Sequence, residues 1–119
     1  MPELPVTAIE PQPDLVVVRV LPDHLDEEPL RRVQEDVRAA AGTRPGLPVI
    51  LDLTHVSFMP SLSLAGLIRL ATDFRARPQR LILAGLQPHV RDVFVVTRLD
   101  RLFDLQEDVE AALRALRPG

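Results

Sequence analysis

Short apolar runs alternate along the chain with longer segments in which apolar residues recur every three or four positions. The run Leu15–Val20 is mostly β-branched and is bounded by turn-forming residues, so it predicts a strand. The runs 47–53 and 80–84 are nearly continuous in apolar residues, a pattern typical of strands buried on both faces of a parallel sheet. A weaker run at 4–9 lies among prolines, which favours an edge strand.

Four further segments carry the helical period of apolar residues. The first follows Asp26, a candidate N-cap, and stops at Gly42, a residue type favoured just past helix ends. The second starts near Ser61 and is ended by Pro78, and the third starts at Pro88, since proline is tolerated in a first turn. The pattern therefore predicts helices over about 27–41, 61–77, 88–97 and 106–116.

The order of these elements predicts the fold class. Strand–helix–strand units with short connections imply parallel pairing and right-handed crossovers. The first two strands are separated only by the turn-like segment 11–14, so they are expected to form an antiparallel hairpin. We therefore predict an α/β fold built on a small mixed sheet.

The length of 119 residues is enough for one hydrophobic core, and we predict a single domain over 1–119. Its proline-rich first part, 1–13, is expected to form an N-terminal strand or extension, and 117–119 a tail. The composition is that of an ordinary globular protein rather than a disordered one.

Charge and cysteine content exclude several classes of protein. A net charge of −3 with dispersed arginines argues against a nucleic-acid binder. The absence of cysteine rules out disulfides and thiolate metal sites, and it fits a reducing cytoplasm.

The chain does not start like a signal peptide, and its longest apolar run, Leu15–Val18, is too short to cross a bilayer. We expect a cytoplasmic protein without membrane insertion.

Ser61 is the main candidate for chemistry because it lies where a buried strand leads into a helix. A hydroxyl there accepts hydrogen bonds from the free N–H groups of the first turn and lies at the positive end of the helix dipole. Asp52 ends the preceding strand, and we interpret it as a residue that orders the next loop rather than one that contacts a partner.

The segment 52–64 reads D-L-T-x-V-x-F-M-P-S-L-S-L and resembles the signature of the STAS domain family, the bacterial anti-sigma factor antagonists. The usual form of that signature is D-L-S-x-V-x-F-[IM]-D-S-[ST]-G-L. Ser61 matches its first motif serine. Here Pro60, Leu62 and Ser63 replace the usual aspartate, second hydroxyl residue and glycine. The segment 81–105 is also similar to the second half of the family, with Arg98 in place of a glycine.

The resemblance implies a STAS fold, with a small mixed sheet and helices packed largely on one side. It also implies a protein-binding regulator whose partner, an anti-sigma factor and serine kinase, phosphorylates a motif hydroxyl. That hydroxyl is expected to be Ser61, with Ser63 as the fallback. The residues expected to contact the partner are Asp26, Met59, Pro60, Ser61, Leu62, Ser63 and Leu64.

Two further interpretations stay open. Pro60 and Leu62 favour a constitutive adaptor, without phosphorylation, that binds a transporter ATPase or a stress-signalling assembly, and a homodimer is also compatible with the sequence. A small hydrolase with Ser61 as nucleophile would need a neighbouring base and oxyanion donors, which no histidine spacing suggests. The histidines show no metal-ligand spacing and no glycine-rich phosphate loop is present, so we expect no enzyme activity, no metal and no cofactor.

Overall fold

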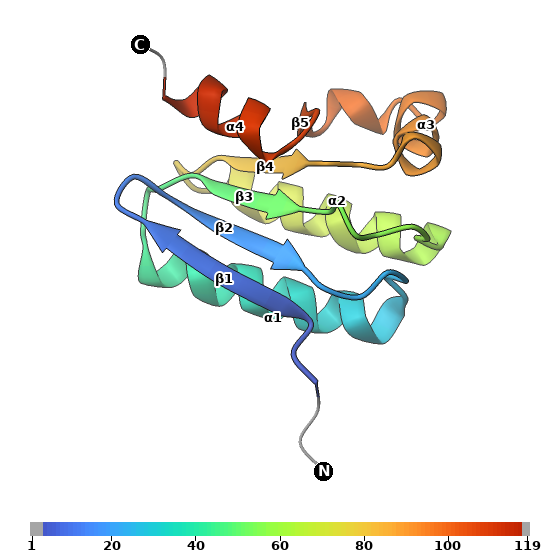
Figure 1. Cartoon of the computed structure of the whole chain (residues 1–119), viewed down its shortest axis with the longest axis horizontal. Helices are drawn as coiled ribbons and strands as arrows, with labels where there is room; N and C mark the ends of the chain where they lie inside the picture. Colours follow the sequence, from blue (N-terminus) through green and yellow to red (C-terminus); the bar gives the residue numbers. More distant parts are fainter. Residues whose placement is uncertain (1–3, 118–119) are drawn as a thin grey trace.

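The computed structural model describes residues 4–117, which form a five-stranded sheet with four α-helices (Figure 1). The sheet order is β1-β2-β3-β4-β5, with β1 antiparallel to β2 and all other neighbours parallel. The predicted mixed α/β sheet is therefore confirmed. The elements are β1 (Thr7–Gln12), β2 (Leu15–Val20), α1 (Glu27–Thr43), β3 (Val49–Asp52), α2 (Ser61–Arg75), β4 (Leu81–Ala84), α3 (Pro88–Val96), a 3-10 turn (Leu99–Arg101), β5 (Asp104–Gln106) and α4 (Val109–Leu116).

The first strand lies three residues later than predicted and includes Pro11. The Leu21 N–H donates to the Val6 carbonyl, so Val6 is a hydrogen-bonded position of the β1–β2 pair. In an antiparallel pair such positions alternate with positions that form no bond to the neighbouring strand. The backbone groups of Thr7, Ile9 and Pro11 therefore point away from β2. Pro11 lacks an N–H, but at this free edge no ladder bond is lost. The turn is consequently only Pro13-Asp14, not the whole segment 11–14.

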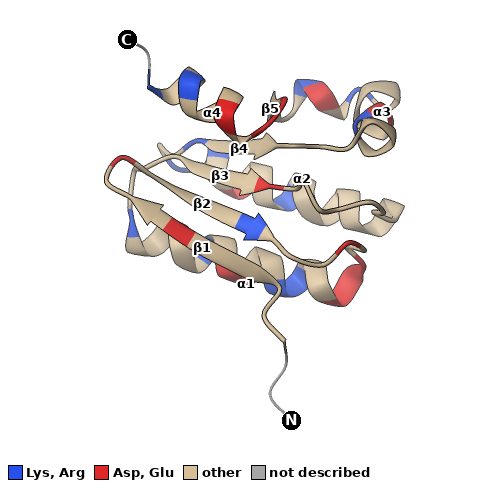
Figure 2. Cartoon of the chain, in the orientation of Figure 1, with Lys and Arg blue, Asp and Glu red and all other residues tan. Residues whose placement is uncertain are grey.

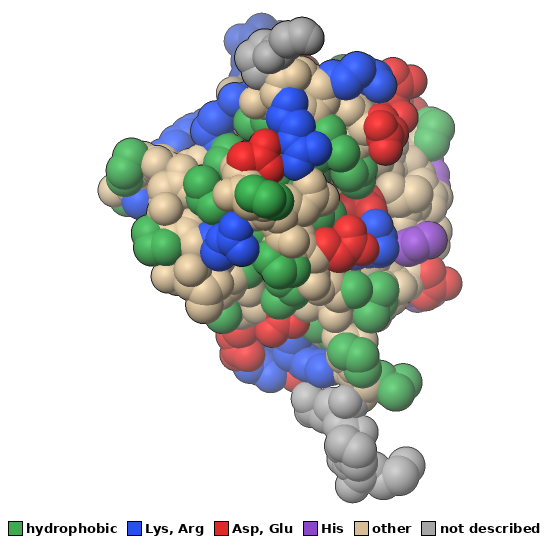
Figure 3. All heavy atoms as spheres, turned by 60° about the vertical axis from the view of Figure 1, so that its left-hand side comes forward, with side chains coloured by type: hydrophobic (Ala, Val, Ile, Leu, Met, Phe, Trp, Pro, Cys, Tyr) green, Lys and Arg blue, Asp and Glu red, His purple; other side chains and the backbone are tan. Residues whose placement is uncertain are grey.

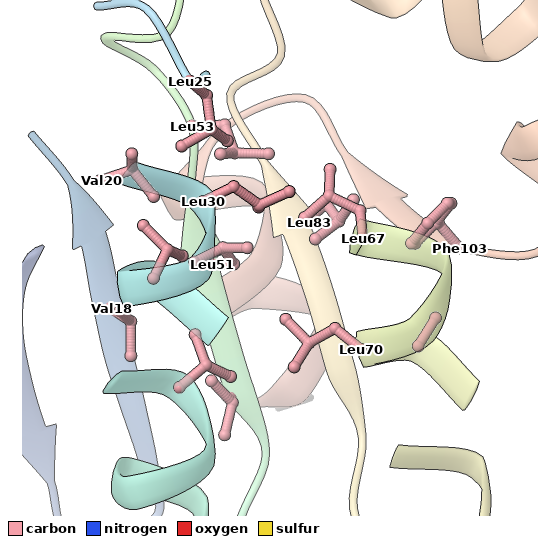
Figure 4. Close-up of a cluster of buried hydrophobic side chains, with 14 of the residues drawn as sticks. Val18, Val20, Leu25, Leu30, Leu51, Leu53, Leu67, Leu70, Leu83 and Phe103 are labelled. Atoms are coloured by element: carbon pink, nitrogen blue, oxygen red, sulfur yellow. The ribbon is translucent and has the colours of Figure 1, made fainter. Parts of the chain in front are cut away.

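The central strands β2, β3 and β4 are buried on both faces, as their nearly continuous apolar runs predict, whereas the edge strands β1 and β5 contain no buried residue. One core packs the strands against α1, α2 and α3, and the other packs them against α4. Three of the four helices thus lie with one core, which confirms the expectation of helices largely on one side. Figure 4 shows the larger core, with labelled side chains Val18, Val20, Leu25, Leu30, Leu51, Leu53, Leu67, Leu70, Leu83 and Phe103.

The last helix starts three residues later than predicted because Asp104–Gln106 pair with β4 as a short edge strand. Asp108 then caps α4, its side chain accepting a hydrogen bond of 2.7 Å from the Ala111 N–H. Arg117, predicted to lie in a tail, instead forms an ion pair of 2.8 Å with Asp14. The other two residues of that predicted tail lie outside the described part of the chain.

None of the helices in the described residues 4–117 has both the length and the apolar character needed to cross a bilayer.

Candidate functional site

The loops that follow β2 and β3 meet at the end of the sheet to which the parallel strands point (Figure 1). Hydrogen bonds join the two loops. The Leu25 N–H donates to the Phe58 carbonyl at 2.9 Å, and the N–H groups of Ser57 and Phe58 donate to the Asp23 carbonyl at 2.8 and 3.2 Å. The His24 ring lies 5.4 Å from the Phe58 ring, centroid to centroid. Segments about 35 residues apart in sequence therefore form one continuous surface.

Asp52 fixes the start of the second loop. One of its carboxylate oxygens accepts from both the N–H and the hydroxyl of Thr54, at 3.0 and 2.5 Å. The other accepts from the Arg19 Nε at 3.2 Å. Hydrogen bonding to Asp52, aided by the nearby charge of Glu10, raises the pKa of Arg19. Asp52 is buried, and its contacts confirm the interpretation that it orders the loop.

Ser61 is the first residue of α2 and its side chain is exposed. The N-cap position belongs to Pro60, in an extended conformation, and no side chain caps the helix. The prediction that Ser61 acts as the N-cap is therefore wrong by one residue, because Pro60 supplies the extended backbone that precedes the first turn. The first turn also contains no acidic residue, so its positive end is not compensated from within the turn.

Ser63 occupies a different environment from Ser61 although the two are close in sequence. Its side chain is fully buried, and its hydroxyl donates to the Leu25 carbonyl at 2.6 Å. A phosphate on this oxygen would replace that hydrogen bond and would require the first turn of α2 to leave the core. The structure thus argues against Ser63 as the fallback acceptor, and we do not retain it.

The other predicted contact residues differ in exposure. Leu62 is 70% exposed, whereas Met59 and Leu64 are half-buried and pack on the core. Asp26 is exposed at the start of α1, on the loop that Ser63 and Phe58 bind. Phe58, which the prediction did not include, is 49% exposed. A segment that exposes both a hydroxyl and large apolar side chains suits binding to another protein.

Helix α3 also contributes to this end of the molecule, which the sequence pattern did not predict. A groove of about 170 Å³ lies between α3 and the start of α2, lined by side chains that include Phe58, Leu64 and Val93. The His89 imidazole, at the start of α3, hydrogen bonds the Ser57 carbonyl and closes one end of this arrangement. The sequence did hold one sign of this role. Helix α3 needs only Val90 and Phe94 to pack on the core, yet it also carries Val95 and Val96, which are exposed.

Acidic and basic side chains are interspersed over the surface. Acidic residues concentrate at the start of α1 (Figure 2), where Glu28 pairs with Arg31 at 2.6 Å. On the face shown in Figure 3, acidic and basic side chains lie next to each other among apolar ones. Within residues 4–117 no group of three His, Asp or Glu side chains is arranged to hold a metal ion.

Comparison with known proteins identifies the family of this chain. Residues 7–112 match the family model described as the STAS domain. BtrV of Bordetella bronchiseptica, a candidate anti-sigma factor antagonist by name, is 32% identical over 69 residues, or 58% of this chain and 60% of that protein. The chain therefore spans less than two thirds of that curated relative.

Solved structures share the same fold. An anti-sigma factor antagonist from Mycobacterium paratuberculosis is 23% identical, with a TM-score of 0.79 over 93% of this chain and 92% of that one. The Bacillus cell fate determinant SpoIIAA in its phosphorylated form is 22% identical, with a TM-score of 0.67 over 92% and 98% of the two chains. With the family match covering most of the sequence, this chain belongs to the STAS domain family.

Proposed function

We propose that this protein is a non-enzymatic, cytoplasmic anti-sigma factor antagonist. In this proposal it binds an anti-sigma factor that is also a serine kinase, and phosphorylation of Ser61 switches the complex. The observation that carries the proposal is the exposed Ser61 hydroxyl at the uncapped start of α2, in a segment that also exposes Phe58 and Leu62. The similarity to BtrV supports the same function.

The helix start favours a phosphate on Ser61 but does not need one for folding. A phosphoserine carries about −1.5 to −2 charges at neutral pH, and negative charge is stabilising at a helix N-terminus. No side chain caps α2 and no acidic residue lies in its first turn, so the added charge would meet little repulsion there. The fold is expected to persist in the phosphorylated protein.

The same phosphate would change the surface that the partner contacts. Leu62 and Phe58 present apolar side chains to solvent in the same segment, and a dianion on Ser61 would have to be desolvated in a complex that covers them. Met59, Pro60 and Leu64 are half-buried residues of the same segment, and Asp26 is exposed at the start of α1, so we propose that the partner contacts them as well. Phosphorylation is therefore expected to weaken a complex that buries this surface.

A constitutive adaptor is the second candidate function, and Pro60 and Leu62 favour it. Proline occupies the position at which the family signature has an aspartate, and the 70% exposed Leu62 replaces a hydroxyl residue. In this case the same surface would bind its partner permanently.

Mass spectrometry of the intact protein tests the switch. The chain contains only three serines, Ser57, Ser61 and Ser63, so single substitutions can assign a phosphoserine completely. The wild type, Ser61→Ala and Ser57→Ala are incubated with ATP and a lysate of the source organism. We expect one added phosphate on the wild type and on Ser57→Ala, and none on Ser61→Ala.

Two outcomes would redirect the proposal. An unmodified wild type that captures a stable partner through Leu62, with binding lost in Leu62→Asp, would establish the constitutive adaptor. A phosphate that persists on Ser61→Ala would contradict the assignment of the acceptor.

A further inference from the structure

A second hollow lies at the opposite end of α2 from Ser61. It has a volume of about 400 Å³ and lies between the end of α2, the start of β4 and the segment before β5. We call it the α2–β5 groove. Since α2 contains 15 residues, each rising about 1.5 Å, the groove lies about 20 Å from Ser61. A ligand in the groove would leave the Ser61 surface free.

The floor of the groove is apolar. Phe74 and Phe103 are buried beneath it, Leu81 is half-buried, and Leu102 remains 38% exposed. Leu81 and Leu102 therefore leave apolar surface on which an apolar side chain of a ligand can pack.

The rim of the groove is basic. Arg75, Arg77 and Arg80 line it, against a single acidic residue, Asp104. Arg80 is neutralised by Asp104 at 2.5 Å. Two positive charges remain at the groove, on a protein whose net charge is −3. This local excess opposes the overall charge of the chain.

The two remaining arginines are only partly used within the protein. Arg75 donates one hydrogen bond of 2.7 Å, to the Leu102 carbonyl, and each guanidinium carries five N–H donors. The Arg77 guanidinium lies 5.5 Å from the centre of the Phe74 ring and forms no ion pair with the described residues 4–117. A basic residue in the last turn of α2 stabilises the negative end of the helix dipole, which explains Arg75. It does not explain Arg77, which lies beyond the end of the helix.

We propose that the α2–β5 groove binds a short acidic segment of a partner protein, in which one apolar side chain is flanked by carboxylates. The apolar side chain would rest on Leu81 and Leu102, above the buried Phe74 and Phe103, and the carboxylates would pair with Arg75 and Arg77. Guanidinium groups suit this role because they bind carboxylates through two parallel hydrogen bonds. A long polyanion fits less well, since Asp104 lies on the rim and the whole chain is acidic.

This interaction does not depend on the proposed switch. Because the groove and Ser61 lie at opposite ends of α2, the protein would hold two partners at once, one at each end.

The test uses the full chain, labelled with ¹⁵N, and an amidated synthetic peptide with one apolar residue, Asp-Glu-Leu-Asp-Glu. We expect amide shifts at Arg77, Leu102 and Phe103 on peptide addition, and weaker binding at higher salt. The double variant Arg75→Gln and Arg77→Gln should lose about tenfold or more in affinity, because two charge-assisted hydrogen bonds are removed. Its own spectrum reports whether it remains folded.

Three controls make the test selective. Arg91→Gln removes an exposed arginine on α3 and should leave the affinity unchanged, as should Ser61→Asp. A peptide with lysine in place of its acidic residues should not bind. Equal binding of both peptides, or no shift at the groove, would overturn the proposal. Shifts with octanoate but none with the acidic peptide would also overturn it, in favour of a small anionic amphiphile.

Discussion

The Ser63 hydroxyl donates a hydrogen bond of 2.6 Å to the Leu25 carbonyl and thereby ties the first turn of α2 to the loop before α1. This bond makes the two serines of the motif functionally unequal, since Ser63 stabilises the fold while Ser61 faces solvent.

Removal of the two hydroxyls should therefore have different effects on stability. We expect Ser63→Ala to lower the free energy of unfolding by about 1–2 kcal/mol, because a buried carbonyl loses its donor. We expect Ser61→Ala to change it by less than about 0.5 kcal/mol, as at an exposed site without a capping bond. Urea denaturation of both variants measures the difference, and similar losses in the two would contradict the assigned roles.

Gly85, directly after β4, is constrained both by conformation and by space. Its φ is +79°, and a Cβ atom there would lie 2.3 Å from the Thr54 hydroxyl and 3.2 Å from the Thr54 backbone. We expect Gly85→Ala to cost about 2–3 kcal/mol in thermal or chemical unfolding, since αL strain adds to displacement of the loop that Asp52 holds.

Gly42 supplies the matched control for that substitution. It lies within α1, and a Cβ atom there would meet nothing within 4 Å. Gly42→Ala should be neutral or raise the stability by up to about 1 kcal/mol, through helix propensity. A larger loss at Gly42 than at Gly85 would refute the argument.

Arg98 adopts a left-handed conformation, with φ at 61° and ψ at 20°, at the position where the family signature has a glycine. We expect Arg98→Gly to raise the free energy of unfolding by about 1 kcal/mol, because glycine lacks the Cβ that makes this conformation costly. Arg98→Ala keeps the Cβ and should bring no such gain. Equal stabilities of the Gly and Ala variants would show that the side chain, not the backbone, determines the effect.

The Asp14–Arg117 pair predicts a defined pH response. Hydrogen bonding to Arg117 lowers the pKa of Asp14 below its ordinary value. The stability that this carboxylate contributes is therefore present above its unfolded pKa and is lost as the pH falls through the lower, folded pKa.

Carboxyl ¹³C NMR titration of Arg117→Gln checks this response. The pKa of Asp14 should rise toward its ordinary value in the variant. The pKa of Glu28, which the hydrogen bond from Arg31 also lowers, should stay where it is. An Asp14 titration that the substitution leaves unchanged would contradict the assigned cause.

Prediction from sequence succeeded where the pattern had a local cause. The β-branched run of β2 and the apolar period of α2 each impose their element directly, and the observed bounds differ by at most two residues. Prediction was less accurate at the edge strands: β1 lies three residues later than expected, and β5 extends past 99–105, for which the sequence predicts a turn with at most one short strand. The bounds of an edge strand depend on a neighbour that the local sequence does not specify. Pro11 is compatible with β1 because its backbone nitrogen, which carries no hydrogen, points away from β2.

The candidate site divides in the same way. Ser61, Leu62 and Asp26 could be named from the motif and the helix starts. The burial of Ser63 could not, since it depends on a carbonyl 38 residues away. The participation of α3 was equally hidden, because no local pattern states that Val93 lies beside Phe58.

The sequence alone determined the family, the order of elements and the place of Ser61, because apolar period and motif spacing are properties of contiguous residues. Tertiary structure alone decided which motif serine is exposed, which loops meet at the start of α2, and that three arginines, one from the end of α2 and two from the connection to β4, line one apolar groove. Those outcomes arise from contacts between segments that are distant along the chain. Such contacts form, and contribute to stability, only when the folded sheet brings the segments together.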